Sequence, residues 1–332
     1  MKSARAESVE RAARPVVGGL VILVALLGLI GTAIKNPQPH DIPVGLVGPA
    51  QATQQLATSF GTAAPGAFRF TTYASEQDAR AAIDARAIDG TLILGPNPRL
   101  VVAGAAGDAA TGVMTAAFTN AFKAQGTALT VDTVHPFSSG DAHGLILFFV
   151  VVATLISTLA VQAVMLATNR SAGLGVQLFV VVVYGVLAGL VGMGTAAWIT
   201  GGSGDGFWAA AGLVALTSAA VGAVIAGCAR LFGAAGIGLA ALVVVLLGLV
   251  SSGGPVGSRL LPDFYRALAP WMPAGQLYDA LRGALFFDGA ALTGPIMVLA
   301  GWFVVGLALM GLGEVVARNR KPAPIAASVQ PA

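Results

Sequence analysis

Cysteine and charge are both scarce in this sequence. Cys228 is the one cysteine, so a disulfide between two residues of the chain is excluded. Charged residues make up 10% of the chain, 56% is hydrophobic, and the mean hydropathy is +0.82. A soluble domain is about 45–50% apolar and 25% charged. The composition therefore indicates an integral membrane protein, and the net charge of +3 is too small to favour nucleic acid as a partner.

Lysine is also rare, and its placement excludes one source of energy. A phosphate-binding loop ends in Gly-Lys-Ser/Thr, where the lysine contacts the nucleotide phosphates. None of the four lysines follows a glycine: Lys2, Lys35, Lys123 and Lys321. The chain also lacks GxSxG, HExxH and comparable motifs. We therefore expect no ATPase, no other enzyme activity and no cofactor in this chain.

Only three histidines occur, and they are weak candidates for metal ligands. His40, His135 and His143 lie near the two ends of one polar segment, with Asp41 and Asp141 nearby. No histidine pair has a helical ligand spacing, and no cysteine joins them. We favour solvated histidines at the membrane interface and expect no metal site.

Long apolar runs are what the sequence has in abundance. A spanning helix needs about 20 mostly apolar residues. Six runs qualify: 16–34, 144–167, 174–199, 207–229, 231–250 and 292–313. The first is longer than the apolar core of a cleaved signal peptide, so we expect a retained anchor. The predicted fold class is an α-helical polytopic membrane protein with six transmembrane helices.

Basic residues predict the orientation, because positively charged loops tend to stay in the cytoplasm. A cytoplasmic N-terminal segment, 1–15, places Arg170, Arg230 and the tail 314–332 inside as well. Residues 35–143 and 251–291 then lie outside. We expect a multi-pass protein of the plasma membrane, N-in and C-in, with the lipid bilayer as its surroundings.

The polar residues 35–143 predict a small extracytoplasmic α/β domain between the first and second spans. Apolar or alternating runs indicate five strands, in 41–49, 68–74, 90–97, 99–105 and 127–137. Helical spacing indicates three helices, in 52–60, 75–89 and 109–126.

From 144 to 313 we expect every charged residue in a loop, which disfavours a proton-driven carrier and leaves a sodium site of carbonyls and hydroxyls open. Uncharged polar side chains within the spans are interpreted as packing contacts: Thr154, Ser157, Thr158, Gln162, Gln177, Tyr184, Thr217 and Ser218. Gly185 and Gly189 form a GxxxG pattern. This pattern predicts close helix packing, within the chain or at a dimer face.

Residues 251–291 are half polar, although apolar runs flank them. Pro262, Pro270 and Pro273 interrupt any helix before 275–287, because proline removes a backbone donor and clashes with the preceding turn. Leucines recur every fourth residue in 275–287, which predicts an amphipathic helix. An interfacial helix that caps the bundle and a re-entrant pair of short helices both stay open.

The fifth run and the residues after it resemble the end of the YhgE/Pip (phage infection protein) family, which belongs with the permeases of type-2 ATP-binding-cassette exporters. The matching residues are Ser252-Gly253-Gly254, Pro255, Leu261-Pro262, Phe264-Tyr265, Pro270, Pro273 and Leu281-Arg282-Gly283. In the N-terminal half, 42–47, 76–88 and 89–96 resemble family segments. The resemblance implies a permease subunit that exports an amphiphilic or lipid-like substrate, works as a homodimer or heterodimer, and receives ATPase activity from a separate ATP-binding subunit.

The resemblance also implies where two sites lie. The candidate outer gate consists of Ser252, Gly253, Gly254, Pro255, Pro262, Phe264, Tyr265, Pro270, Trp271, Pro273 and Arg282. Arg282 is expected to hold a lipid headgroup or a carboxylate, Asp279 or Asp288. Candidate ATPase-coupling residues are Arg11, Arg14 and Arg170, although the loop 168–173 is short for a coupling element. The basic N-terminal stretch is either an interfacial amphipathic helix or a topogenic signal alone.

Two other functions stay open from the sequence. The outer domain of an ATPase-independent membrane protein can bind a cell-surface partner as a receptor or scaffold. Alternatively, the chain can support efflux or drug tolerance without an ATPase. Co-purification of a nucleotide-binding subunit distinguishes both from the coupled exporter.

Overall fold

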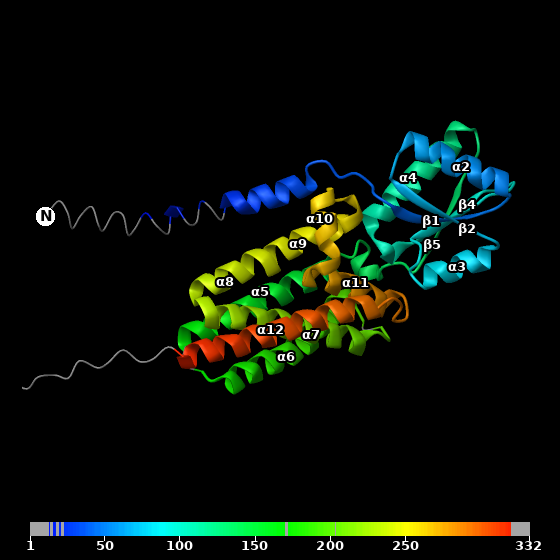
Figure 1. Cartoon of the computed structure of the whole chain (residues 1–332). Coiled ribbons are helices and arrows are strands. Elements are labelled where there is room, and N and C mark those ends of the chain that lie inside the picture. The colour runs from blue at the N-terminus through cyan, green and yellow to red at the C-terminus, as the bar shows by residue number, and fades with distance from the viewer. Residues whose placement is uncertain are drawn as a thin grey trace, which may run out of the picture.

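The computed structural model describes residues 23–169, 172–202 and 204–319, together with residues 13, 16, 17 and 20. Long helices lie side by side in a bundle, and an α/β unit lies beyond one end of this bundle (Figure 1). The chain runs from the helix Leu23–Ile34 into the α/β unit and enters the bundle at Leu145.

One five-stranded sheet, in the order β2-β1-β3-β4-β5, organises the α/β unit. Its strands are β1 (Ile42–Val47), β2 (Phe68–Tyr73), β3 (Gly90–Ile93), β4 (Arg99–Ala103) and β5 (Thr130–Val134). Only β3 and β4 pair antiparallel, and the other neighbours are parallel. Parallel strands need long crossovers. The helices α2 (Ala50–Ala63), α3 (Glu76–Asp84) and α4 (Asp108–Ala124) provide them, and all eight elements overlap the predicted ones.

An apolar layer covers each face of the sheet. Phe118 of α4 packs with Ile42 and Leu100 on one face. Neighbouring strand residues point to the opposite face. There, Ile83 of α3 packs in a cluster that includes Phe287 from the helix bundle. The second layer is therefore shared between the α/β unit and the bundle, which fixes the unit against the bundle.

Five described helices are long and apolar enough to cross a membrane: α5 (Leu145–Thr168), α6 (Leu174–Thr200), α7 (Phe207–Phe232), Ala234–Val256 and α12 (Thr293–Asn319). The fourth comprises α8 (Ala234–Ala240), a π-helical stretch (Ala241–Leu247), α9 (Gly248–Ser251) and a final turn. The first predicted span, 16–34, falls partly outside the described residues, and Leu23–Ile34 is its continuous helical part. The six-span topology thus stays a prediction.

The helix α7 lies at the centre of the bundle, where most of its residues are buried. Two glycines of α6 face it. A Cβ atom at Gly189 would lie 2.2 Å from the carbonyl oxygen of Ala211, and one at Gly185 would lie 2.9 Å from that of Ala215. The GxxxG pattern therefore packs α6 against α7 within one chain.

The predicted ends of two long helices were wrong, and both errors involve charged residues. Arg230 was expected to separate two spans, but it lies inside α7, and the break follows at Gly233 with a φ of 64°. The last helix also extends beyond the expected end to Asn319 and includes Glu314. These two charges are tolerated inside helices because they neutralise each other: Arg230 Nη1 lies 2.6 Å from Glu314 Oε2.

Residues 251–291 form short helices between the last two long ones. After two 3₁₀ turns come α10 (Asp263–Leu268), another 3₁₀ turn and α11 (Pro273–Phe286). Pro262 precedes α10, and Pro273 is the first residue of α11, where a missing N–H costs nothing. On α11, Leu277 and Leu281 are fully buried in the core of the bundle. Tyr278, Ala280 and Gly283, on other sides of the helix, are buried as well, so α11 is packed on several sides.

Candidate functional site

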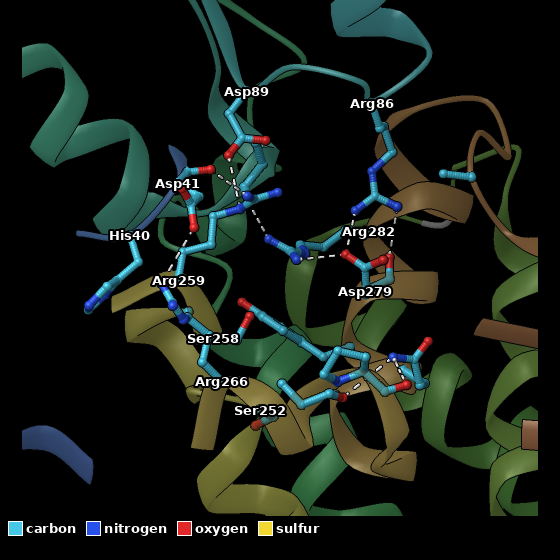
Figure 2. Close-up of a pocket in the computed structure, with 18 of the residues that line it drawn as sticks. His40, Asp41, Arg86, Asp89, Ser252, Ser258, Arg259, Arg266, Asp279 and Arg282 are labelled. Carbon is cyan, nitrogen blue, oxygen red and sulfur yellow. Dashed lines mark hydrogen bonds and ion pairs between the residues drawn. The ribbon is translucent and has the colours of Figure 1, made fainter. Parts of the chain in front are cut away.

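A polar cavity of about 520 Å³ lies between the α/β unit and residues 251–291. Charged side chains reach it from both parts (Figure 2): Arg86, Arg259, Arg266, Arg282, Asp41, Asp89 and Asp279, together with His40. Sites for small molecules measure roughly 300–1,000 Å³ and carry a few convergent polar groups. This cavity is therefore the candidate functional site.

Asp279 of α11 is the centre of one ion cluster. The Nη2 atoms of Arg86 and Arg282 lie 2.6 Å and 2.9 Å from the same oxygen, Asp279 Oδ1. Arg282 also donates to the carbonyl oxygen of Ala106. Burial alone would raise the pKa of Asp279, but the charges and hydrogen bonds of Arg282 and Arg86 outweigh it and hold the pKa below its ordinary value. The cluster joins α11 to two loops of the α/β unit.

The local backbone explains how both arginines reach Asp279. Arg86 follows the end of α3 in the left-handed conformation, with a φ of 59°. Its guanidinium lies over the ring of Phe287, 5.2 Å from the centroid. Gly283 leaves room for it, because a Cβ atom there would lie 2.8 Å from Arg86 Nη1. Arg282 lies over the ring of Tyr278 at 4.9 Å.

Asp89, immediately before β3, belongs to a second cluster on the other side of the cavity. Arg259 Nε lies 3.5 Å from Asp89 Oδ2, and Arg259 Nη1 donates to the carbonyl oxygen of Asp41 at 2.9 Å. Arg266 lies 3.7 Å from the Asp41 carboxylate. Burial raises the pKa of Asp89, and the charges of the nearby arginines, Arg259 foremost, oppose this shift without cancelling it.

Two buried nitrogen atoms at the cavity have no hydrogen-bond partner among the described residues. They are Nε of Arg282 and Nδ1 of His40. A buried polar group without a partner costs about 1–3 kcal/mol and is uncommon in native structures. The cavity therefore has hydrogen-bonding groups that the surrounding chain does not satisfy.

The predicted gate residues divide into two groups. Ser252, Pro270 and Arg282 line the cavity. The others lie beside it in the local fold: Gly253, Gly254, Pro255, Pro262, Phe264, Tyr265, Trp271 and Pro273. Gly254 has a φ of 49°, and a Cβ atom there would lie 3.1 Å from the ring of Phe148. These residues shape the segment and are not brought together in one opening.

Two aromatic residues of 251–291 are exposed, and a third contacts the helix Leu23–Ile34. Phe264 and Trp271 are exposed. Tyr265 is buried instead, where its hydroxyl lies 2.6 Å from that of Thr32 and donates to the carbonyl oxygen of Leu29 at 2.9 Å. Tyr265 thus fastens α10 to the helix Leu23–Ile34.

Four charged residues of the cavity were not singled out from the sequence: Arg86, Asp89, Arg259 and Arg266. Arg86 and Asp89 lie in the segments 76–88 and 89–96, but the resemblance marks neither residue individually, and all four come from loops or short helices. Their charge, in a chain with few charged residues, is the only signal that the sequence offers. The left-handed conformation of Arg86 leaves no mark in the sequence pattern.

The three histidines lie in three separate places. His135 Nε2 is 2.8 Å from Asp84 Oδ1, and His143 Nδ1 is 3.1 Å from Asp108 Oδ2. His40 lies at the cavity. Across the residues that the structure describes, no group of three or more potential metal ligands occurs.

The opposite end of the bundle carries the partly buried pair of Arg230 and Glu314. Arg230 Nη2 also donates to the carbonyl oxygen of Ala172 at 2.8 Å, and Nε donates to the side chain of Gln177. This network ties α6, α7 and α12 together beside the connection between α5 and α6. The predicted coupling residues near it and at the N-terminus, Arg11, Arg14 and Arg170, lie outside the described residues.

Polar side chains within the spans bond mainly to neighbouring helices or to their own backbone. The hydroxyls of Thr158 on α5 and Ser218 on α7 lie 2.8 Å apart. Thr154 and Thr217 donate to carbonyl oxygens one turn earlier. These contacts agree with a packing role for such groups.

The comparisons with known proteins place this arrangement in a family. A family model described as ABC-2 family transporter protein matches residues 16–312, which is most of the chain. No curated protein and no solved structure matches it. The matched range includes the apolar helices, the α/β unit and the short helices between α9 and α12. The chain is thus a multi-pass membrane protein and belongs to the ABC-2 transporter family.

Proposed function

We propose that the chain is the permease subunit of an ATP-binding-cassette exporter of the YhgE/Pip type. It moves an amphiphilic, lipid-like substrate outward, and a separate subunit binds and hydrolyses ATP. Two permease chains, identical or different, form the pathway. The chain itself performs no chemical reaction, and residues 35–143 and 251–291 lie on the outer side of the plasma membrane.

Family membership is the observation that carries this proposal. The match covers residues 16–312. The sequence has no Gly-Lys-Ser/Thr loop, so ATP hydrolysis needs another chain. Residues Ser252-Gly253-Gly254 and Leu281-Arg282-Gly283 are among those that support the YhgE/Pip assignment.

Charge distribution supports the orientation. The network of Arg230 and Glu314 lies at the end of the bundle where α5 connects to α6. In the sequence, Arg170 lies in this connection, and further basic residues follow the last apolar run. Basic residues favour the cytoplasmic side. The polar cavity then lies at the outer end, between α11 and the α/β unit.

Affinity purification from native membranes tests the proposal. The full chain is tagged at its C-terminus, solubilised in a mild detergent and purified, and its partners are identified by mass spectrometry. We expect a nucleotide-binding subunit to co-purify and to hydrolyse ATP. Purification without any ATP-binding protein, together with capture of a cell-surface protein by the α/β unit, would instead favour the receptor or scaffold function.

The short connection around Arg170 provides a second arm. Arg170→Ala combined with shortening of the loop 168–173 should abolish stimulation of the partner's ATPase activity. Unchanged stimulation would remove this loop from the coupling mechanism. Arg318→Ala is the matched control, because Arg318 is an exposed arginine near the same end of the bundle.

A further inference from the structure

The cavity between the α/β unit and α11 contains more positive charge than its own carboxylates balance. Four arginines and three aspartates line it. Arg86 and Arg282 share one carboxylate oxygen of Asp279, so this group of three carries a net positive charge. A charge held away from water needs a partner, because desolvation without one is costly.

The second cluster adds to the imbalance. Arg259 is 3.5 Å from Asp89, a long ion-pair distance, and burial disfavours the ionised form of Asp89. Arg266 contacts an exposed carboxylate, Asp263, at 3.0 Å and reaches Asp41 only at 3.7 Å. Arg259 is therefore not fully neutralised by Asp89, whereas Arg266 has two carboxylate partners, Asp41 in the cavity lining and Asp263 beside it.

One buried donor beside this space is not used by the surrounding chain. Arg282 Nε is buried without a hydrogen-bond partner, and Figure 2 shows Arg259 and Arg282 reaching into the cavity from opposite sides. Guanidinium groups bind phosphate and carboxylate oxygens with paired, charge-assisted hydrogen bonds. Several guanidinium groups around one space suit a phosphate best, because its oxygens point in several directions.

Apolar surface next to the cavity indicates that the phosphate belongs to an amphiphile. Pro270 and Ala269 line the cavity, and Trp271, which follows them, and Phe264 of the preceding α10 are exposed. Exposed aromatic rings beside a membrane helix are typical of the headgroup level of the bilayer. A ligand with a phosphate in the cavity can therefore keep its acyl chains against this apolar surface.

We propose that this cavity binds the phosphate group of an anionic amphiphile, with Arg259, Arg266 and Arg282 as its ligands. The inference rests on the proposed export function, because it names the substrate class. Arg86 and Asp279 are positioning residues here: they hold Arg282 and fix α11 against the α/β unit.

Direct binding to the purified full chain tests the assignment. The chain is kept in a neutral maltoside detergent without ATP, and microscale thermophoresis measures binding of three probes: dihexanoyl phosphatidylglycerol, inorganic phosphate and uncharged dihexanoylglycerol. We expect saturable binding of phosphatidylglycerol, weaker binding of inorganic phosphate, and none of dihexanoylglycerol. Arg259→Gln and Arg266→Gln should each weaken phosphatidylglycerol binding about tenfold or more, because each removes a charge-assisted hydrogen bond.

Arg69→Gln is the matched control, since it removes the same charge from the exposed strand β2 of the same unit. It should leave the affinity unchanged, and the Tm of each variant verifies that it is folded. Equal binding of phosphatidylglycerol and inorganic phosphate would retain the phosphate site but overturn its assignment to an amphiphile. The site would be overturned if neither cavity variant changed the affinity for phosphatidylglycerol. It would also be overturned if dihexanoylglycerol bound as tightly as phosphatidylglycerol. Because no ATP is involved, either result leaves the co-purification of an ATPase as a separate question.

Discussion

Arg86 and Asp279 lie far apart in the sequence, yet Arg86 Nη2 is 2.6 Å from Asp279 Oδ1. Arg86 also donates to the backbone carbonyl oxygen of Asp279 at 3.1 Å. A side chain of the α/β unit thus binds both the backbone carbonyl and the carboxylate of one residue of α11. This double contact sets the angle between the two parts and therefore the shape of the cavity between them.

The Arg86–Asp279 contact predicts a measurable coupling. Arg86→Gln should lower the free energy of unfolding by about 1–3 kcal/mol, because Asp279 is half-buried and keeps Arg282 as a partner. In a double-mutant cycle with Asp279→Asn, the interaction energy should be about 1–2 kcal/mol. Detergent-based unfolding of the purified chain measures both. Strictly additive effects would mean that this contact does not hold the two parts together.

The pKa shifts of Asp89 and Asp279 predict opposite effects of pH on stability. The lowered pKa of Asp279 means that its stabilising contribution is present above the ordinary aspartate pKa, about 3.9, and is lost as the pH falls through the lowered pKa. The raised pKa of Asp89 means that its ionised form costs stability as the pH rises from the ordinary value through the raised one.

Asp89→Asn isolates the second effect. The variant should lose the part of the fall in Tm that the wild type shows as the pH rises above the ordinary aspartate range. Asp132→Asn is the control, because Asp132 lies on β5 of the same unit with a 41% exposed side chain. A Tm profile of Asp89→Asn that follows the wild type would contradict the raised pKa of Asp89.

Helix packing predicts that two nearby glycines respond differently. Gly189→Ala should destabilise the chain by about 1–3 kcal/mol, because the new methyl group meets the Ala211 carbonyl oxygen and forces α6 away from α7. Gly194→Ala, on the same helix, meets nothing within 4 Å and should be neutral or slightly stabilising. Thermal unfolding compares the two, and equal losses would argue against close packing at Gly189.

The ion pair of Arg230 and Glu314 makes a prediction about the effect of burial on stability. Arg230→Met should cost about 2–4 kcal/mol, because it leaves the mostly buried Glu314 without its closest partner. Arg318→Met removes an arginine that also pairs with Glu314, at 3.2 Å, but is 76% exposed. That change should cost less than about 1 kcal/mol. The order of the two losses in unfolding experiments checks the argument, and a reversed order would refute it.

Periodicity in the sequence predicts the elements well but not their contacts. The short apolar run around Val44 marks β1, and the apolar run before Thr168 marks α5 to within one residue. By contrast, the end of α7 was misplaced, since Arg230 read as a loop residue. Its helical position depends on Glu314, which a local pattern does not reveal.

The cavity was predictable only in part. Arg282 stood out through the family resemblance, and Asp279 was one of its two expected partners. The roles of Arg86 and Asp89 depend on tertiary contacts of the α/β unit with α11 and with Arg259. Such contacts depend on how distant parts of the chain pack together. Local sequence patterns do not reveal this packing, so these residues are identified only in the structure.

Transport in inside-out membrane vesicles tests the central claim most directly. Vesicles from native cells with and without the chain receive fluorescent phosphatidylglycerol in the outer leaflet, which is the former cytoplasmic leaflet, and dithionite measures how much becomes protected. The account predicts ATP-dependent protection that requires the chain and fails with a non-hydrolysable ATP analogue. Protection that is the same without the chain, or without ATP, would contradict an ATP-driven export function for this permease.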